Sequence, residues 1–366
     1  MHYYKIIPTP LEPWHRLEFE YPFEPSALDG YCGQKDCVTH TLTQNFDNCP
    51  QTNSPTTLFF LWINYPEGAL FKRDYIDHMI AAKQYAPDHF TVCLYCNHDD
   101  FLSEEMRTRL KESDITLKIL SQAVPQECKE PASKRVKLDN PSDISPFTYF
   151  DIVQKALAKL PEEEAIKKEI IKLVREEVIK KEILTLAGEE DDDEAADCLS
   201  HELRELSLNT ILNRYFQAGE VGLDVDMMRL LIMLASDTPT VYMDLDIQVR
   251  SSEFFTPLLK ADAVAAFISN IENQPLLNND YMKLSPELLR AYIVRILKNF
   301  CMDTAGGCPW EGDVPKASGP FVFMQTMADC LKKDQLASKT WLIPSGVYGE
   351  NGFAENKQEQ TWSYTE

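Results

Sequence analysis

Thr57-Leu58-Phe59-Phe60-Leu61-Trp62-Ile63 is the stretch that decides the fold. A run without charge, rich in aromatic and branched side chains, is typical of a strand that is buried on both faces. Two other largely apolar runs cover residues 89–96 and 115–120. Amphipathic segments at residues 73–85 and 103–112 separate the three runs and have the helical period. Strands that alternate with helices predict a parallel sheet covered on both faces, so we expect an α/β fold.

The same alternation returns in the second half of the chain. Strands are predicted at residues 240–244, 263–269 and 341–344, and helices at residues 203–217, 224–235, 286–300 and 321–331. The expected organisation is an irregular N-terminal arm (1–55), the first half of an α/β core (56–120), a polar, proline-broken loop (121–145), an inserted helical subdomain (146–218) and the second half of the core (219–366).

Composition narrows the classes of function. The chain has 366 residues and a formal net charge of −22. Nucleic-acid binding needs a basic surface, so this acidity argues against it. No apolar run reaches the roughly 18–20 residues that cross a bilayer, and the N-terminus lacks the apolar stretch of a secretory signal. We therefore expect a soluble protein without a transmembrane segment.

Cysteine usage predicts a reducing compartment. Cys93 and Cys96 form a C-x-x-C, and His98 follows two residues later. A zinc site would need a second Cys or His pair at similar spacing, and none is evident in the sequence. We expect ordinary core thiols, with a metal site as the alternative.

Residues 241–247 read Val-Tyr-Met-Asp-Leu-Asp-Ile and carry the chemistry. On a strand, side chains at i and i+2 point to the same face, so Asp244 and Asp246 should lie together with Tyr242. Carboxylate oxygens at the end of a strand suit Mg²⁺ or Mn²⁺ held against a diphosphate.

The helix that precedes this strand contributes a second charged pair. Asp226 and Arg229 are three residues apart and share a helix face. Met227, Leu230 and Leu234 lie on another face, so the helix can bury one side and present the pair on the other. The alternative is a surface ion pair worth about 0–1 kcal/mol. The position just before the Asp-x-Asp strand favours a functional pair.

An Asp-x-x-Arg helix followed by a Tyr-x-Asp-x-Asp-Ile strand resembles the large glucosylating toxins of clostridia and related bacterial effector glucosyltransferases. Four other segments match in order, namely 59–63, 277–286, 318–323 and 359–362. The likeness touches roughly residues 57–98 and 205–366. One departure stands out, because the Gly-Gly that usually precedes the strand is here replaced by Asp237-Thr238-Pro239-Thr240.

The resemblance implies a GT-A-type, Rossmann-like, mostly parallel sheet and a metal-dependent glycosyltransferase. The donor it implies is UDP-glucose, with UDP-N-acetylglucosamine second, and the cofactor is Mn²⁺ or Mg²⁺. The acceptor is a hydroxyl group of a host protein, and the anomeric configuration is retained.

The resemblance also implies roles for individual residues. Asp226 and Arg229 hold sugar hydroxyls. Asp246 binds the metal, and Asp244 binds hydroxyls or the metal through water. Trp62 stacks on the uracil. The further implied contacts to donor and metal are Tyr242, Asn278, Asn279, Gly319, Glu359, Thr361 and Trp362, of which Glu359 and Thr361 reach the metal and Trp362 closes a lid over the sugar phosphate.

Pro131-Ala132-Ser133-Lys134-Arg135-Val136-Lys137-Leu138-Asp139 resembles a monopartite nuclear-import signal. An extended basic peptide can lie in an acidic groove, so the segment Lys134–Asp139 predicts binding to a nuclear import receptor. A solvated loop is the alternative. With this segment, the expected location is the cytosol or nucleus of a host cell into which an effector is secreted.

Two other functions stay open. The first is a housekeeping glycosyltransferase that acts on glycans or lipids, although the lack of an anchor or signal argues against most secretory-pathway versions. The second is a catalytically decayed interaction protein on the same fold. Its working surface would be the Glu/Lys-rich helix at residues 162–184 and the acidic run at residues 189–194.

Overall fold

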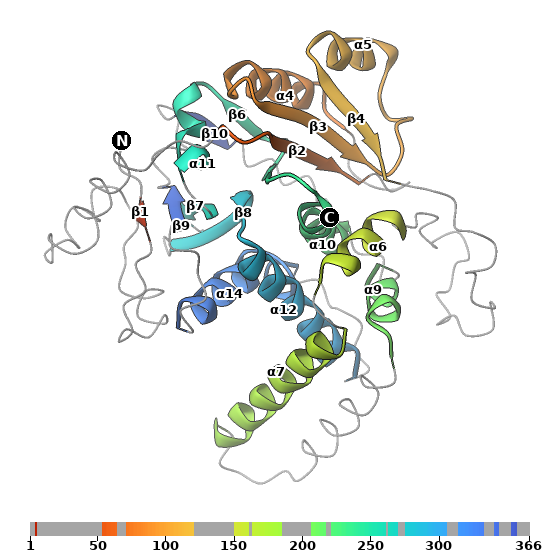
Figure 1. The fold of residues 1–366 in the computed structure, drawn as a ribbon, viewed down its shortest axis with the longest axis vertical. Coiled ribbons are helices and arrows are strands. Elements are labelled where there is room, and N and C mark those ends of the chain that lie inside the picture. Colours follow the sequence, from red (N-terminus) through yellow and green to blue (C-terminus); the bar gives the residue numbers. More distant parts are fainter. Residues whose placement is uncertain are drawn as a thin grey trace, which may run out of the picture.

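One mixed sheet organises the fold (Figure 1). The computed structural model describes residues 4–5, 53–63, 71–120, 150–160, 163–184, 206–216, 221–260, 263–269, 275–305, 314–332, 340–343 and 353–356. Within these residues the sheet has eight strands in the order β1 (Tyr4–Lys5), β9 (Thr340–Ile343), β7 (Ala263–Ser269), β8 (Pro275–Lys283), β5 (Thr240–Met243), β2 (Thr56–Trp62), β3 (Phe90–Cys96) and β4 (Ile115–Ile119).

The sheet is mostly parallel. β2, β3, β4 and β5 run in one direction, and β7 and β9 are parallel to each other. β8 is antiparallel to both of its neighbours, and β1 is antiparallel to β9. The α/β class that the alternation of strands and helices predicted is therefore confirmed.

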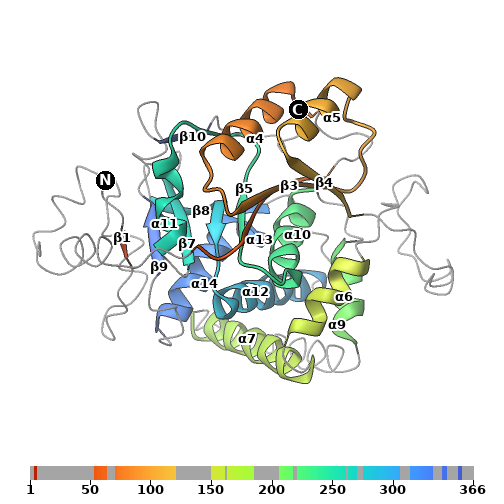
Figure 2. The same ribbon diagram turned by 45° about the horizontal axis from the view of Figure 1, so that its top comes forward.

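Helices cover both faces of the sheet (Figure 2). The core on one face is formed with α4 (Arg73–Tyr85), α5 (Glu104–Glu112), η4 (Ser252–Phe255) and α11 (Thr256–Lys260). The core on the other face is formed with α6 (Phe150–Lys159), α7 (Glu163–Leu184), α9 (Leu208–Phe216), α10 (Val221–Ala235), α12 (Pro286–Ala305), α13 (Val314–Ala317) and α14 (Pro320–Lys332). In Figure 2, α4 and α5 lie above the sheet, and α7, α10 and α12 lie below it.

The central strand β2 serves both cores. Leu58, Phe60 and Trp62 point into the core formed with α4 and α5. Phe59 and Leu61 point into the core formed with α10 and α12. Since every one of these side chains is at most 7% exposed, the strand reads as a continuous apolar run and not as an alternating one.

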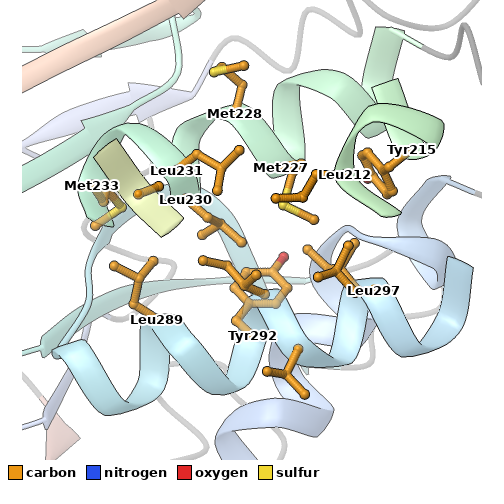
Figure 3. Packing of buried hydrophobic residues seen from close by; sticks show 14 of the residues in the cluster. Leu212, Tyr215, Met227, Met228, Leu230, Leu231, Met233, Leu289, Tyr292 and Leu297 are labelled. Atoms are coloured by element: carbon orange, nitrogen blue, oxygen red, sulfur yellow. The ribbon is translucent and has the colours of Figure 1, made fainter. Parts of the chain in front are cut away.

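Helix α10 is packed between the sheet and the other helices of its layer. Met227, Leu230 and Leu231 are fully buried. Figure 3 shows Met227 and Leu230 directed toward Tyr292 and Leu297 of α12. Burying one such side chain stabilises a fold by roughly 1.5–3 kcal/mol. The packing fixes the helix on several sides, and it therefore buries the polar residues of α10 as well.

The helices of the predicted insertion share this core. Val153 of α6, Ile170 of α7 and Leu212 of α9 belong to the same cluster as Phe59 of the sheet. An inserted helical subdomain was expected at residues 146–218. In the described part of this segment, the helices complete the layer on one face of the sheet and enclose no core of their own.

Strands β8 and β6 (Ile247–Val249) were not predicted. β8 contains Asn278, Asn279 and Asp280, and a strand with such a polar run has no hydrophobic signature. Beyond the Asp-x-Asp segment, β6 pairs with β10 (Ala354–Asn356) in a separate two-stranded sheet. Three residues are too few for a periodic pattern, so pairing partners far along the chain decide such strands.

Some predictions fall outside the described residues. The basic run Lys134–Asp139, the acidic run at residues 189–194, and Glu359, Thr361 and Trp362 belong to this group. None of the helices within the described part of the chain is long and apolar enough to span a bilayer.

The C-x-x-C motif does not form a chelating pair. Cys93 packs in the cluster with Phe59, and Cys96 packs in the cluster with Trp62, so the two thiols lie on opposite faces of β3. Both are free cysteines. Burial raises the pKa of the Cys96 thiol to about 12 and also raises the pKa of Cys93. These residues are the core thiols that the sequence analysis expected.

We expect Cys93 and Cys96 to resist alkylation in the native protein at pH 8. A thiol with a pKa near 12 is almost wholly protonated there, and the thiolate is the reactive form. Iodoacetamide labelling followed by peptide mass spectrometry checks this, with guanidinium-unfolded protein as the positive control. Rapid labelling of either residue in the native protein would contradict the burial described above.

Candidate functional site

The two aspartates of the Asp-x-Asp segment lie in a tight turn between β5 and β6. β5 ends at Met243, and the backbone N–H of Ile247 donates to the carbonyl of Asp244 at 3.3 Å. The N–H of Asp244 donates to the carbonyl of Asp280 on β8 at 2.7 Å. Strand periodicity predicted a common face for the two aspartates. In the structure neither aspartate belongs to the strand, so the turn sets their relative orientation.

Tyr242 connects the buried strand to the turn. Its ring is 1% exposed and its hydroxyl donates to the carboxylate of Asp244. Burial raises the pKa of Tyr242 well above its ordinary value, and the negative charges of Asp244 and Asp246 raise it further. The phenol therefore keeps its proton and acts as a hydrogen-bond donor to Asp244.

Asp226 and Arg229 of α10 form a buried ion pair. They are 5% and 3% exposed, and the guanidinium contacts the carboxylate directly. Asn279 donates from Nδ2 to Oδ1 of Asp226 at 3.1 Å, and Ser318 donates from Oγ to Oδ2 at 2.6 Å. The alternative of a solvated surface pair is therefore wrong. Both oxygens of Asp226 are engaged by the protein.

Arg229 links this buried pair to the turn. Its Nη1 donates to the carbonyl of Asn279 at 2.8 Å and lies 3.9 Å from Oδ1 of Asp244. The centre of the guanidinium lies 4.9 Å from the centre of the Tyr242 ring, a cation–π distance. A single side chain thus joins α10, β8 and the Asp-x-Asp turn.

A tyrosine from α12 closes the network on its far side. Tyr292 donates from its hydroxyl to the carbonyls of Ser318 at 2.6 Å and Gly319 at 3.1 Å, and it accepts from Asn279 at 3.3 Å. Burial raises the pKa of Tyr292 to about 12. Gly319 is itself buried, in the turn before α14. The Ser-Gly-Pro segment is therefore held beside Asp226 by a neutral phenol.

The carboxylate of Asp244 is the part of the network that solvent can reach. Its side chain is 32% exposed. Burial raises the pKa of the Asp244 carboxyl, although the positive charge of Arg229 and the hydrogen bond from Tyr242 lower it. The negative charge is thus only partly compensated, and a cation beside the turn would stabilise it further.

Asp244 and Asp246 fit a magnesium or manganese ion that also binds a ligand. Within the described parts of the chain, no three His, Cys, Asp or Glu side chains gather as they would around a metal held by protein alone. One or two carboxylates are nevertheless the usual protein ligands of such an ion when phosphates and water complete its coordination.

Trp62 packs in the cluster that contains Leu245 of the turn, and not in the cluster that contains Tyr242. Its ring is 7% exposed and packs at centroid distances of 5.3 Å from Phe71, 5.8 Å from Tyr75 and 6.2 Å from Phe101. It points to the face of the sheet opposite to Phe59, the ring that contacts Tyr242. At 7% exposure, the Trp62 ring presents little surface on which a base could stack.

The remaining predicted residues divide into three groups. Asn279 and Gly319 belong to the network. Asn278 lies on β8 opposite Ala266, and the structure describes only its backbone. Glu359, Thr361 and Trp362 follow β10, whose last residue, Asn356, pairs with Ile247 at the start of β6. Their placement is not described.

Sequence reasoning missed Ser318, Tyr292 and His78, of which His78 contacts the Leu245 carbonyl in the turn. Ser318 stands in the Ser-Gly-Pro segment that the sequence analysis singled out, so the signal for it was present. Tyr292 and His78 occupy amphipathic helices, where a tyrosine or histidine is indistinguishable from ordinary core.

No protein-family model matches the chain, and no curated protein matches it. Among solved structures, the chain is similar to one described as "PaToxG Glycosyltransferase", with a TM-score of 0.36 and 12% identity over 79% of this chain and 74% of that chain. A likeness this distant leaves the function to be argued from the site.

We expect Asp226→Asn to lower the free energy of unfolding by about 3 kcal/mol, because Arg229 would be left buried without its main counter-charge. Urea unfolding followed by circular dichroism measures the change. Glu169→Gln is the matched control, since its pair with Arg290 is about one-third exposed on both sides and should contribute no more than about 1 kcal/mol. Equal losses for the two variants would contradict a special role of the buried pair.

Proposed function

We propose that this protein is a metal-dependent glycosyltransferase that uses a UDP-sugar donor. The observation that carries the proposal is the chain of contacts from the buried Asp226–Arg229 pair, through Arg229 and Tyr242, to the partly exposed Asp244. This chain ends just beyond the carboxyl end of β5, within a mostly parallel sheet, which is where open α/β sheets bind ligands.

The charge of the leaving group explains why carboxylates that bind a cation would be needed in the turn. Breaking the anomeric bond of a nucleotide sugar places negative charge on a diphosphate. A divalent ion held by Asp246, with Asp244 in support, would neutralise that charge as it develops. Tyr242 and Arg229 keep Asp244 oriented, so the protein has little reorganisation to make during the reaction.

Arg229 is the proposed holder of the sugar hydroxyls. Its Nε has no hydrogen-bond partner among the described residues, and a charged donor in a site shielded from water binds hydroxyls strongly. Asp226 already accepts from Asn279 and Ser318 and pairs with Arg229, so about one of its roughly four acceptor sites is left for a sugar hydroxyl. In this proposal Trp62 stacks on the base, Trp362 closes the site, and Glu359 and Thr361 assist at the metal.

The finer proposals are a glucose or N-acetylglucosamine donor, retention at the anomeric carbon, and a host protein hydroxyl as the acceptor of a bacterial effector.

A second function is favoured by one observation. Because both oxygens of Asp226 are engaged by the protein itself, the pair could be a structural remnant in an interaction protein that no longer transfers sugar.

We expect Asp244→Asn and Asp246→Asn each to reduce Mn²⁺-dependent release of UDP from UDP-glucose by at least about a hundredfold, because removing one electrostatic stabiliser of a transition state costs about 3–4 kcal/mol. Mass spectrometry of UDP formed without an acceptor measures this, and a screen of UDP-sugars identifies the donor.

The matched control is Asp237→Asn. Asp237 lies shortly before β5, its side chain is 94% exposed and it pairs with Lys159. This variant should turn over like the wild type, and all three should have wild-type circular dichroism. Absence of UDP release and of metal-dependent UDP binding in the wild type would favour the interaction protein. Unchanged release in Asp244→Asn or Asp246→Asn would refute the metal role.

For the basic segment, we expect the double change Lys134→Ala and Arg135→Ala to move a fluorescently tagged protein from nucleus to cytoplasm in eukaryotic cells, since import receptors bind such peptides through their basic side chains. The ratio of nuclear to cytoplasmic fluorescence is the measurement. Lys72→Ala with Arg73→Ala, at the start of α4, is a control of equal charge. An unaltered ratio would discard the import signal.

A further inference from the structure

A histidine from the opposite helix layer contacts the middle of the Asp-x-Asp turn. His78 lies on α4, which packs against β6, and its side chain is 5% exposed. Its Nδ1 lies 2.8 Å from the carbonyl oxygen of Leu245. Leu245 stands between the two aspartates, so this is a contact to the backbone that carries both carboxylates.

The direction of this hydrogen bond follows from its chemistry. A carbonyl oxygen can only accept, so Nδ1 of His78 carries the hydrogen and donates it. The contact is buried, where a hydrogen bond that loses its donor leaves an acceptor without water to replace it. The bond therefore favours one orientation of the Leu245 carbonyl over all others.

That carbonyl belongs to the peptide that can flip in a four-residue turn. The turn runs from Asp244 to Ile247, and Leu245 and Asp246 are its central residues. Turns of types I and II differ mainly by rotation of the peptide between the two central residues, and type II needs a positive φ at the second of them. Among the described non-glycine residues, only Asp114 has a positive φ, so the turn is not of type II.

Rotation of this peptide would reorient the side chain that follows it. The nitrogen of this peptide belongs to Asp246, and Asp244 directly precedes Leu245. The side chain of Leu245 is 7% exposed and packs in the cluster that contains Met79 of α4. Hydrophobic contact thus holds the turn against α4, while the hydrogen bond selects the orientation of its central peptide.

We propose that His78 is a positioning residue for the Asp-x-Asp turn. Its Nδ1–H fixes the Leu245 carbonyl, and the fixed peptide keeps the carboxylates of Asp244 and Asp246 oriented toward a common cation. The consequence for metal use rests on the proposed function, whereas the effect on the turn itself does not.

Two substitutions separate the hydrogen bond from the volume of the ring. In His78→Asn the amide Nδ2 occupies the place of Nδ1 and can donate to Leu245. In His78→Leu the donor is lost and the apolar bulk is largely kept. Should His78→Leu fail to fold, His78→Gln replaces it, because its amide reaches the position of Nε2 and not that of Nδ1. Met79→Leu is the control for packing alone, since Met79 is fully buried one residue away.

The first measurement is hydrogen–deuterium exchange by mass spectrometry, on peptides that contain the amide of Ile247. We expect exchange to be about tenfold faster in His78→Leu or His78→Gln than in the wild type, as loss of one buried hydrogen bond predicts. His78→Asn and Met79→Leu should stay within about twofold of the wild type. Unchanged exchange in the donor-less variants, or equal acceleration in Met79→Leu, would overturn the proposal.

The second measurement is the Mn²⁺ concentration that half-saturates UDP release. It should rise about tenfold in the donor-less variants, with kcat at saturating Mn²⁺ nearly unchanged, and return to the wild-type value in His78→Asn. A purely structural role would instead lower kcat and stability together. If the wild type releases no UDP, the proposed function fails, and the exchange experiment still decides whether His78 holds the turn.

Discussion

The buried ion pair of Asp226 and Arg229 is the interaction on which the site depends. Two charges removed from water are tolerated only when their hydrogen-bonding capacity is met. Asn279 and Ser318 meet it for the carboxylate, and the carbonyl of Asn279 meets part of it for the guanidinium. The pair therefore fixes the relative positions of α10, β8 and the turn before α14. Arg229 of this pair also lies 3.9 Å from the partly exposed carboxylate of Asp244.

The Asp-x-Asp turn is held from both layers of the molecule. Tyr242 of β5 and Arg229 of α10 act on Asp244 from the face of the sheet that α10 covers. His78 acts on the Leu245 carbonyl from α4 on the opposite face. A short turn has few internal constraints, so contacts from two rigid layers are what give a pair of carboxylates a defined orientation. Such preorganisation is what binding a cation and a diphosphate together requires.

Prediction from the sequence succeeded where a local pattern has one structural solution. Strand β2 and helix α4 appear where apolar runs and helical periodicity placed them, within one or two residues. The pattern failed for β8, because Asn279 and Asp280 interrupt any hydrophobic signal, and for the turn, because strand periodicity was extended past the end of β5. It favoured a functional role for the Asp226–Arg229 pair over a surface ion pair but did not predict that the pair is buried.

The sequence by itself determined the α/β class, most helices and strands, and the residue types of the site, since these depend on side-chain periodicity and on chemistry over a few positions. Only the tertiary structure decided that the ion pair is buried, that Ser318 and Tyr292 complete its hydrogen bonds, that Trp62 faces the other core, and that His78 reaches the turn. These contacts join residues as much as 167 positions apart. No local pattern encodes such distances, because packing of the whole sheet and its two helix layers brings the partners together.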